Sequence, residues 1–180
     1  MTTPHDTTSD DMLSDDYLAG LPARPIAEIR AMRDDCTTVE TGLSYLRRMV
    51  QGSLDIVSRE LVRRAVGGHA DRSTLIAELP GILAEGPRPD GVGRLPVTLD
   101  PDYVDPELAG ELEDIVGGGV VADVTTMDDP ALAELQRRLE SFEQRVSQRR
   151  QAFFDLIDAL NGELARRYRD GEASVDSLLA

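Results

Sequence analysis

Residues 40–55 read Glu40-Thr-Gly-Leu-Ser-Tyr-Leu-Arg-Arg-Met-Val-Gln-Gly-Ser-Leu-Asp55 and carry two periodic patterns at once. The apolar residues Leu43, Leu46 and Val50 are spaced by three and four, which predicts a helix with one buried stripe. A polar stripe recurs at intervals of four, three, four and four: Glu40, Ser44, Arg47, Gln51 and Asp55. Helical geometry, at about 100° per residue, places these five side chains within an arc of roughly 80°.

The apolar pattern extends in both directions as a heptad. Its a positions are Ile29, Cys36, Leu43, Val50 and Val57. Its d positions are Met32, Val39 and Leu46, and Leu54 and Leu61 widen the stripe at e. Pro25 suits the opening turn of a helix, and Gly67-Gly68 supply a stop. The pattern therefore predicts a first long helix over residues 25–66.

A second heptad follows Asp128-Asp129-Pro130, an acidic cap with proline in the first turn. Its a positions are Leu132, Leu139, Val146, Phe153 and Leu160, and its d positions are Leu135, Phe142 and Leu156. Arg149 also occupies d, where it must snorkel or meet an acidic residue. This helix is predicted over residues 129–170. Two such helices in one chain predict an all-α fold, an antiparallel coiled coil.

The remaining residues are predicted to serve the helix pair. Residues 1–24 are acidic and aperiodic, which predicts a disordered N-terminal arm. The long connection 67–128 is rich in Gly and Pro and contains two short helical patterns. One pattern covers 73–79 and ends at Pro80-Gly81, and the other covers 106–116 and ends at Gly117-Gly118-Gly119. Residues 171–180 form a C-terminal tail.

Charge and composition limit the function. The net charge is −15, so a broad surface that follows DNA phosphates is not expected, and a basic protein is the more plausible partner. One cysteine, Cys36, excludes an internal disulfide and suits a reducing compartment. The chain has neither a signal-peptide pattern nor a run of 18 apolar residues. We therefore expect a soluble, cytoplasmic protein that binds neither DNA nor membranes.

The polar stripe occurs twice. Glu143, Ser147, Arg150 and Asp158 repeat its offsets 103 residues further on, with Phe154 in the place of Gln51. One such stripe is ordinary for the solvated face of a coiled coil, but repetition in the same heptad phase favours a duplicated ligand site. Arginine can bind guanine O6 and N7 or phosphate, and carboxylates can accept hydrogen bonds from guanine N1 and N2. The stripes are typical of a guanine-nucleotide binder.

Catalytic chemistry has no comparable signal. The sequence contains no nucleophile paired with a base, no metal-ligand spacing and no phosphate-binding glycine loop in its proper context. His5 and His69 are isolated, and Cys36 lies at a packing position. We therefore expect a protein that is not an enzyme and holds no metal.

The signature Glu-x3-Ser-x2-Arg-x3-Gln-x3-Asp resembles that of the RsiG family, actinobacterial anti-sigma factors that bind cyclic di-GMP. Residues 40–55 match it completely and the second copy matches at four of five positions. The resemblance implies a dimer of cyclic di-GMP held between the two motif helices. It also implies that the loaded protein sequesters a WhiG-type, flagellar-type sigma factor, which blocks its transcription and restrains late development such as sporulation. Phe154 departs from the pattern, and its ring can stack on a base.

A second interpretation belongs to a different functional class. In it the protein is a ligand-free coiled-coil adaptor or scaffold, and the two stripes form only surface salt bridges.

Overall fold

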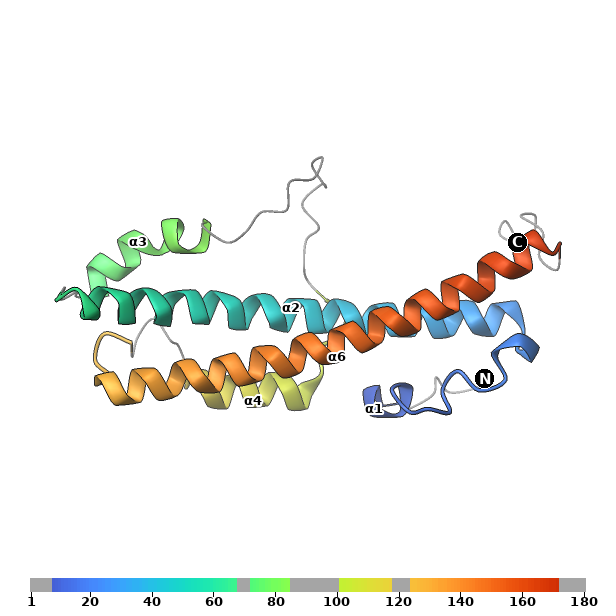
Figure 1. Ribbon diagram of the computed structural model, residues 1–180, viewed down its shortest axis with the longest axis horizontal. Helices are drawn as coiled ribbons and strands as arrows, with labels where there is room; N and C mark the ends of the chain where they lie inside the picture. The colour runs from blue at the N-terminus through green and yellow to red at the C-terminus, as the bar shows by residue number, and fades with distance from the viewer. Residues whose placement is uncertain (1–7, 68–71, 85–100, 118–123, 172–180) are drawn as a thin grey trace. The chain divides into compact units, whose positions relative to one another are not determined.

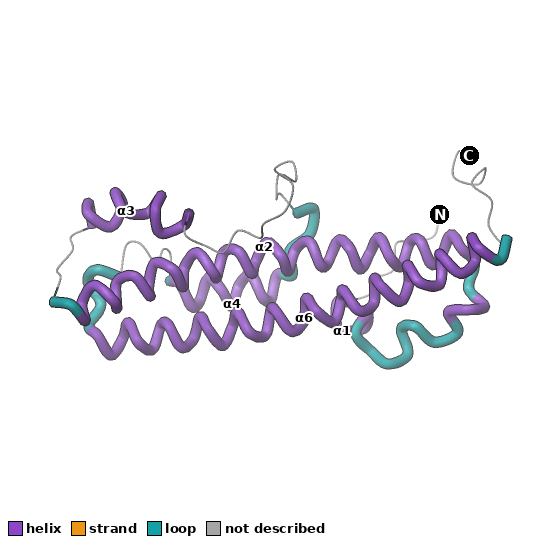
Figure 2. Tube along the Cα trace, turned by 45° about the horizontal axis from the view of Figure 1, so that its top comes forward, coloured by secondary structure: helices purple, strands orange, loops and turns teal. Residues whose placement is uncertain are grey.

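The computed structural model describes residues 8–67, 72–84, 101–117 and 124–171, and these contain helices and no strand (Figures 1 and 2). The elements are α1 (Ser9–Met12), the 3-10 helix η1 (Leu21–Ala23), α2 (Ile26–Ala65), α3 (Arg72–Ala84), α4 (Pro106–Val116) and α6 (Asp129–Arg169). The two long helices begin and end within one residue of the predicted bounds. None of the helices in these ranges is both long and apolar enough to cross a membrane.

The chain forms two compact units, and each long helix contributes to both. The first unit contains residues 1–43, 101–105 and 148–180, and the second contains 44–100 and 106–147. In the first unit Arg30 contacts Tyr168 and Glu40 bonds to Arg150. In the second unit Arg47 bonds to Glu143, and Arg64 to Asp129. In both units, residues later in α2 contact residues earlier in α6. The two helices are therefore antiparallel in each unit, as predicted.

The core of each unit is the predicted seam. All ten a positions are at most 1% exposed: Ile29, Cys36, Leu43, Val50, Val57, Leu132, Leu139, Val146, Phe153 and Leu160. Five of the predicted d residues are also buried: Met32, Val39, Leu46, Leu135 and Phe142. Leu54, Leu61 and Leu156 are only half-buried, whereas Ile56 and Leu164 are buried although the heptad did not assign them. Burial of this seam is the main favourable term in the fold.

The prediction of a disordered N-terminal arm is wrong for the part of the arm that the structure describes. Its described part, residues 8–24, is folded, whereas we predicted a disordered arm over 1–24; residues 1–7 lie outside the described residues. Thr8 and Asp11 form a capping box around α1, which gives this short helix its start. Arg149 donates to Ser9 Oγ at 2.6 Å and also contacts Asp10. The arginine at a d position thus meets an acidic partner, as one of its two predicted alternatives required.

The connection between the long helices contains both predicted short helices. α4 ends as predicted, with Gly117 in the left-handed region at φ 58° and its N–H bonded to the Glu113 carbonyl. α3 does not end at Pro80 but continues to Ala84. A proline removes one helical hydrogen bond, and packing of the neighbouring turns, here through the buried Leu75, can compensate. Residues 85–100 and the tail from 172 lie outside the described residues.

Gly42 has a packing reason that the sequence did not reveal. A Cβ at this position would lie 2.3 Å from the carbonyl oxygen of Tyr103 and 3.4 Å from the Cα of Val104. The backbone of residues 101–105 therefore rests directly on α2 at Gly42. Only glycine allows this approach, which outweighs its poor helix propensity of about 1 kcal/mol relative to alanine.

Both long helices end in the same pattern. Residues 60–64 read Glu-Leu-Val-Arg-Arg and residues 163–167 read Glu-Leu-Ala-Arg-Arg, again 103 apart. Arg64 donates from Nη1 to the Met127 carbonyl at 2.8 Å and from Nη2 to the Val124 carbonyl at 2.9 Å. We call this contact the Arg64 clamp.

The second clamp has the same atoms in the same roles. Arg167 donates from Nη1 to the Arg24 carbonyl at 2.6 Å and from Nη2 to the Leu21 carbonyl at 2.9 Å. In both clamps Nε bonds to the glutamate four residues earlier, Glu60 at 2.6 Å or Glu163 at 2.7 Å. Each clamp therefore ties the end of one long helix to the segment that leads into the other.

We expect Gly42→Ala to destabilise the fold. The clash with Tyr103 costs about 1–3 kcal/mol, as overpacking generally does, and exceeds the gain in helix propensity of about 1 kcal/mol. Gly162→Ala is the matched control, because Gly162 is exposed in α6 and a Cβ there meets nothing within 4 Å. Denaturant unfolding should show Gly42→Ala less stable and Gly162→Ala slightly more stable than the parent. A stable Gly42→Ala would mean that residues 101–105 do not rest on α2.

Acid should weaken the Arg167 clamp. Hydrogen bonds from Arg166 and Arg167 lower the pKa of Glu163 from 4.5 to about 2. A carboxyl whose pKa is depressed by folding contributes stability above its unfolded pKa and loses it as pH falls through the folded value. Glu163→Gln should therefore flatten the loss of unfolding free energy between pH 4.5 and about 2. Parallel stability profiles for Glu163→Gln and the parent would contradict this, and Glu134→Gln on the exposed face provides the control.

Candidate functional site

The first half of the predicted site lies in the second unit, where four predicted residues meet. Arg47 donates from Nε to Glu143 Oε1 at 3.0 Å and to Ser147 Oγ at 2.8 Å. Gln51 Nε2 and Ser147 Oγ also donate to this Glu143 oxygen, at 3.3 and 2.9 Å. We call these residues the Arg47 half-site. It joins the first motif, on α2, to the second motif, on α6.

The Arg47 half-site has an open donor face. The Arg47 side chain is 36% exposed, and within the described residues only its Nε donates a hydrogen bond. Its two Nη groups thus have no acceptor in the described part of the chain. A guanidinium so arranged can bind a planar acceptor pair, such as a guanine edge or a phosphate, through its Nη groups.

The second half of the predicted site lies in the first unit and is built differently. Arg150 donates from Nε to Glu40 Oε1 at 3.0 Å, the counterpart of Arg47 with Glu143. Its guanidinium carbon lies 4.7 Å from the centre of the Phe154 ring, a cation–π contact. We call Arg150, Glu40 and Phe154 the Arg150 half-site. Phe154 thus stacks on the arginine of its own motif, in the place where Gln51 bonds to Glu143.

The three remaining predicted residues are Ser44, Asp55 and Asp158. Ser44 is half-buried on α2. Asp55 and Asp158 are exposed, one turn beyond Gln51 and Phe154. Desolvation of its carboxyl raises the pKa of Asp55 even though the residue as a whole is exposed. The structure therefore brings six predicted residues into pairs and leaves the two aspartates at the solvent-facing end of each stripe.

The motif occupies one edge of the helix pair in each unit. All four paired charges, Glu40, Arg47, Glu143 and Arg150, are at heptad position e. Residues 101–105 and α4 contact the opposite g edge. There Gly42 contacts Tyr103 in the first unit, and Arg145 contacts Glu111 of α4 in the second.

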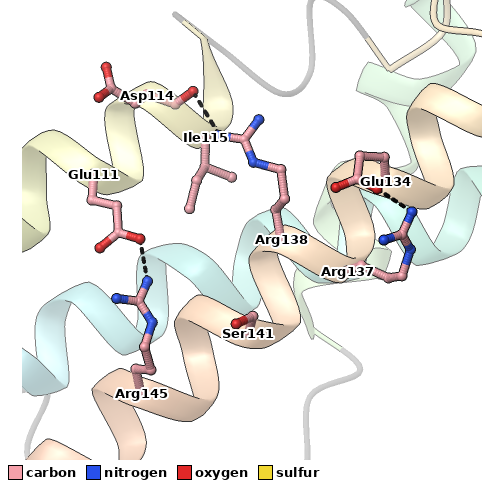
Figure 3. A pocket seen from close by; sticks show the side chains of 8 residues that line it. All are labelled: Glu111, Asp114, Ile115, Glu134, Arg137, Arg138, Ser141 and Arg145. Atoms are coloured by element: carbon pink, nitrogen blue, oxygen red, sulfur yellow. Dashed lines mark hydrogen bonds and ion pairs between the residues drawn. The ribbon is translucent and has the colours of Figure 1, made fainter.

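A groove of about 470 Å³ lies between α4 and α6 in the second unit (Figure 3). Its arginines are already paired: Arg145 with Glu111, Arg137 with Glu134, and Arg138 with the Asp114 carbonyl at 3.5 Å. Ile115 closes the groove on the α4 side. Arg145 and Arg138 hold α4 against α6, whereas Arg137 pairs within α6, so we assign the groove to helix docking and not to a ligand. The described residues contain no group of three or more side chains suited to hold a metal ion.

Together, fold and site define a class of protein: an antiparallel helix pair that carries a duplicated motif whose arginine and glutamate pair across the two helices. The RsiG-like family model matches residues 15–83 and 119–180, and the chain belongs to this family. Family membership indicates an anti-sigma-factor type of function, with a sigma factor as partner. The chain matches none of the curated proteins with which it was compared.

We expect the two half-sites to differ in strength. The Arg47–Glu143 pair is partly exposed and should show a coupling of about 0.5–1 kcal/mol in a double-mutant cycle, reduced by salt. The Arg150–Glu40 pair is more shielded, at 27% and 15% exposure, and Phe154 orients its arginine. Its coupling should be larger and should fall in a Phe154→Gln background. Equal couplings that do not respond to Phe154→Gln would contradict the assigned role of the ring.

Proposed function

We propose that this protein is a cyclic di-GMP-responsive anti-sigma factor. In this proposal the two half-sites bind cyclic di-GMP, as a dimer, and the loaded protein sequesters a WhiG-type sigma factor. It is a binding protein and not an enzyme, with the nucleotide as a regulatory ligand. The observation that carries the proposal is the duplicated Arg–Glu pairing across the helices, which assembles recognition chemistry from both motifs in each unit.

The ligand's charge requires local cations on an acidic protein. Cyclic di-GMP carries two phosphodiesters, and the chain has a net charge of −15. Long-range attraction therefore cannot bring the ligand to this surface, and specific arginines must supply the favourable contacts. Arg47 offers open Nη donors, and Arg150 presents a guanidinium already aligned on an aromatic ring. Both features support anion or guanine binding at these positions.

The motif carboxylates give the ligand selectivity in this proposal. Guanine presents N1–H and N2–H donors, which a carboxylate accepts, whereas adenine presents no such pair on that edge. Asp55 and Asp158 are exposed at the end of each stripe, and neither pairs with another residue in the described part of the chain. Their exposure supports a role for them as acceptors of those hydrogens. Glu40 and Glu143 are engaged with arginines and would exchange partners when the ligand binds.

The ligand-free adaptor remains the alternative, and one observation favours it. Each motif arginine already has a carboxylate within 3.0 Å, so the charge of each arginine is balanced without a nucleotide. A protein that uses the pairs only to join its helices would show the same contacts. Binding measurements separate the two functions.

Titration calorimetry with cyclic di-GMP tests the proposal. We expect Arg47→Ala and Arg150→Ala to weaken binding about 10- to 100-fold, the equivalent of losing a charge-assisted contact of about 1.5–3 kcal/mol. Helicity should be unchanged, because both side chains lie beside the seam and not in it. Arg137→Ala is the control, since it removes an exposed arginine that pairs with Glu134 within α6.

The partner is tested in the same series. Affinity for a WhiG-type sigma factor, measured with and without cyclic di-GMP, should rise with the ligand, and linkage requires the sigma factor to tighten ligand binding by the same factor. Unchanged nucleotide affinity in both arginine variants, or sigma affinity indifferent to the ligand, would favour the adaptor.

A further inference from the structure

We propose that Arg64 and Arg167 are positioning residues that fix the register of α2 against α6, and that each thereby sets the geometry of one half-site. This inference rests on the proposed function for its ligand, but the register itself can be measured without one. The motif does not include these two arginines.

The first argument is the repetition of the clamp atom by atom. In both clamps Nε bonds to the glutamate four residues earlier, Nη1 to one backbone carbonyl, and Nη2 to the carbonyl three residues before that one. The acceptors are themselves 103 residues apart, Leu21 with Val124 and Arg24 with Met127. The motif, the apolar seam and the clamps thus all repeat after 103 residues. The clamps are therefore part of the same duplication as the site.

The second argument is the place of these arginines in the heptad. Arg64 and Arg167 continue the a positions after Val57 and Leu160, where an apolar side chain would normally pack. Arg167 is 6% exposed, and Glu60, at d beside Arg64, is 2% exposed. Buried charges of this kind add little net stability compared with apolar residues of similar size. A polar residue at an a position is instead a known means of specifying register.

The third argument is that an apolar seam alone does not specify register. A seam of Val, Leu and Ile can slip by a heptad, about 10 Å at 1.5 Å per residue, with modest loss of packing. The clamps oppose such a slip, because each planar guanidinium must donate to two particular backbone carbonyls. A slip in the second unit would also carry Arg47 away from Glu143. The clamp therefore selects the one register in which the half-site exists.

Each clamp lies in the same unit as one half-site. The Arg64 clamp and the Arg47 half-site are in the second unit, and the Arg167 clamp and the Arg150 half-site are in the first. The two positioning roles can therefore be removed separately. The clamp arginines bond to Glu60 or Glu163 and to backbone carbonyls outside the motif, so loss of affinity in a clamp variant would act through helix position.

The test replaces a clamp by the apolar pair that a regular heptad would have, Glu60→Leu with Arg64→Met. This change preserves seam packing, so the helices should still pair. Nitroxide labels at two exposed sites of the second unit, 48 and 144, report the register in a Cys36→Ala background by their distance distribution. Labels at 37 and 155 do the same for the first unit, with Glu163→Leu/Arg167→Met as its variant. Arg59→Met, which removes an exposed arginine, is the control.

We expect each clamp variant to broaden or shift the distance distribution of its own unit and to weaken cyclic di-GMP binding at least tenfold with helicity retained. The Arg64→Lys and Arg167→Lys variants keep the charge beside Glu60 and Glu163 but lack the planar guanidinium fork. They should show the same loss of cyclic di-GMP affinity. If an apolar variant fails to fold, these lysine variants test the inference in its place.

Unchanged distances in the clamp variants, or shifted distances with full affinity, would overturn the inference. If the parent protein itself does not bind cyclic di-GMP, the proposed function fails, while the distances still decide whether these arginines fix the register.

Discussion

The structure depends on one constraint, the register of two antiparallel helices. Arg47 reaches Glu143 and Arg150 reaches Glu40 because the two helices run in opposite directions in one register. In both pairs the two residue numbers have the same sum, as one antiparallel register requires. A slip of a single residue would move a side chain by about 1.5 Å and turn it by about 100°, which no side-chain adjustment at the e positions could absorb. The seam, the clamps and the approach of residues 101–105 to Gly42 are all consistent with this one alignment.

The division of the helix pair into two edges follows from that alignment. In an antiparallel pair, e positions of one helix meet e positions of the other, and g positions meet g positions. Residues 101–105 and α4 contact the g edge through Tyr103 and Glu111. The recognition residues occupy the e edge, where Arg47 keeps open donors. These two segments of the connection thus have a structural role, because they pack on the edge that carries no motif.

Much of the helix pair could be predicted from sequence, because a heptad with caps constrains both period and ends. Pro25 and Gly67 bounded α2 to within one residue, and all ten a positions are buried. The stripe residues were found, but not their partners, because a heptad does not define which turn of one helix faces which turn of the other. The clamps were missed although Glu60-x3-Arg64 and Glu163-x3-Arg167 share the motif's offset. The arm over 8–24 was misjudged, since its order comes from Thr8, Asp11 and the distant Arg149 and not from any local periodicity.

Phe154 also shows that two copies of a motif on one chain can differ from each other. In a symmetric pair of identical chains, every substitution appears twice, and the two sites change together. Here Gln51 and Phe154 occupy equivalent positions with different chemistry, so one arginine stays open to solvent on an amide-lined site while the other lies against a ring. A single gene can therefore alter one half-site without altering its counterpart, whereas in a homodimer both sites would change together.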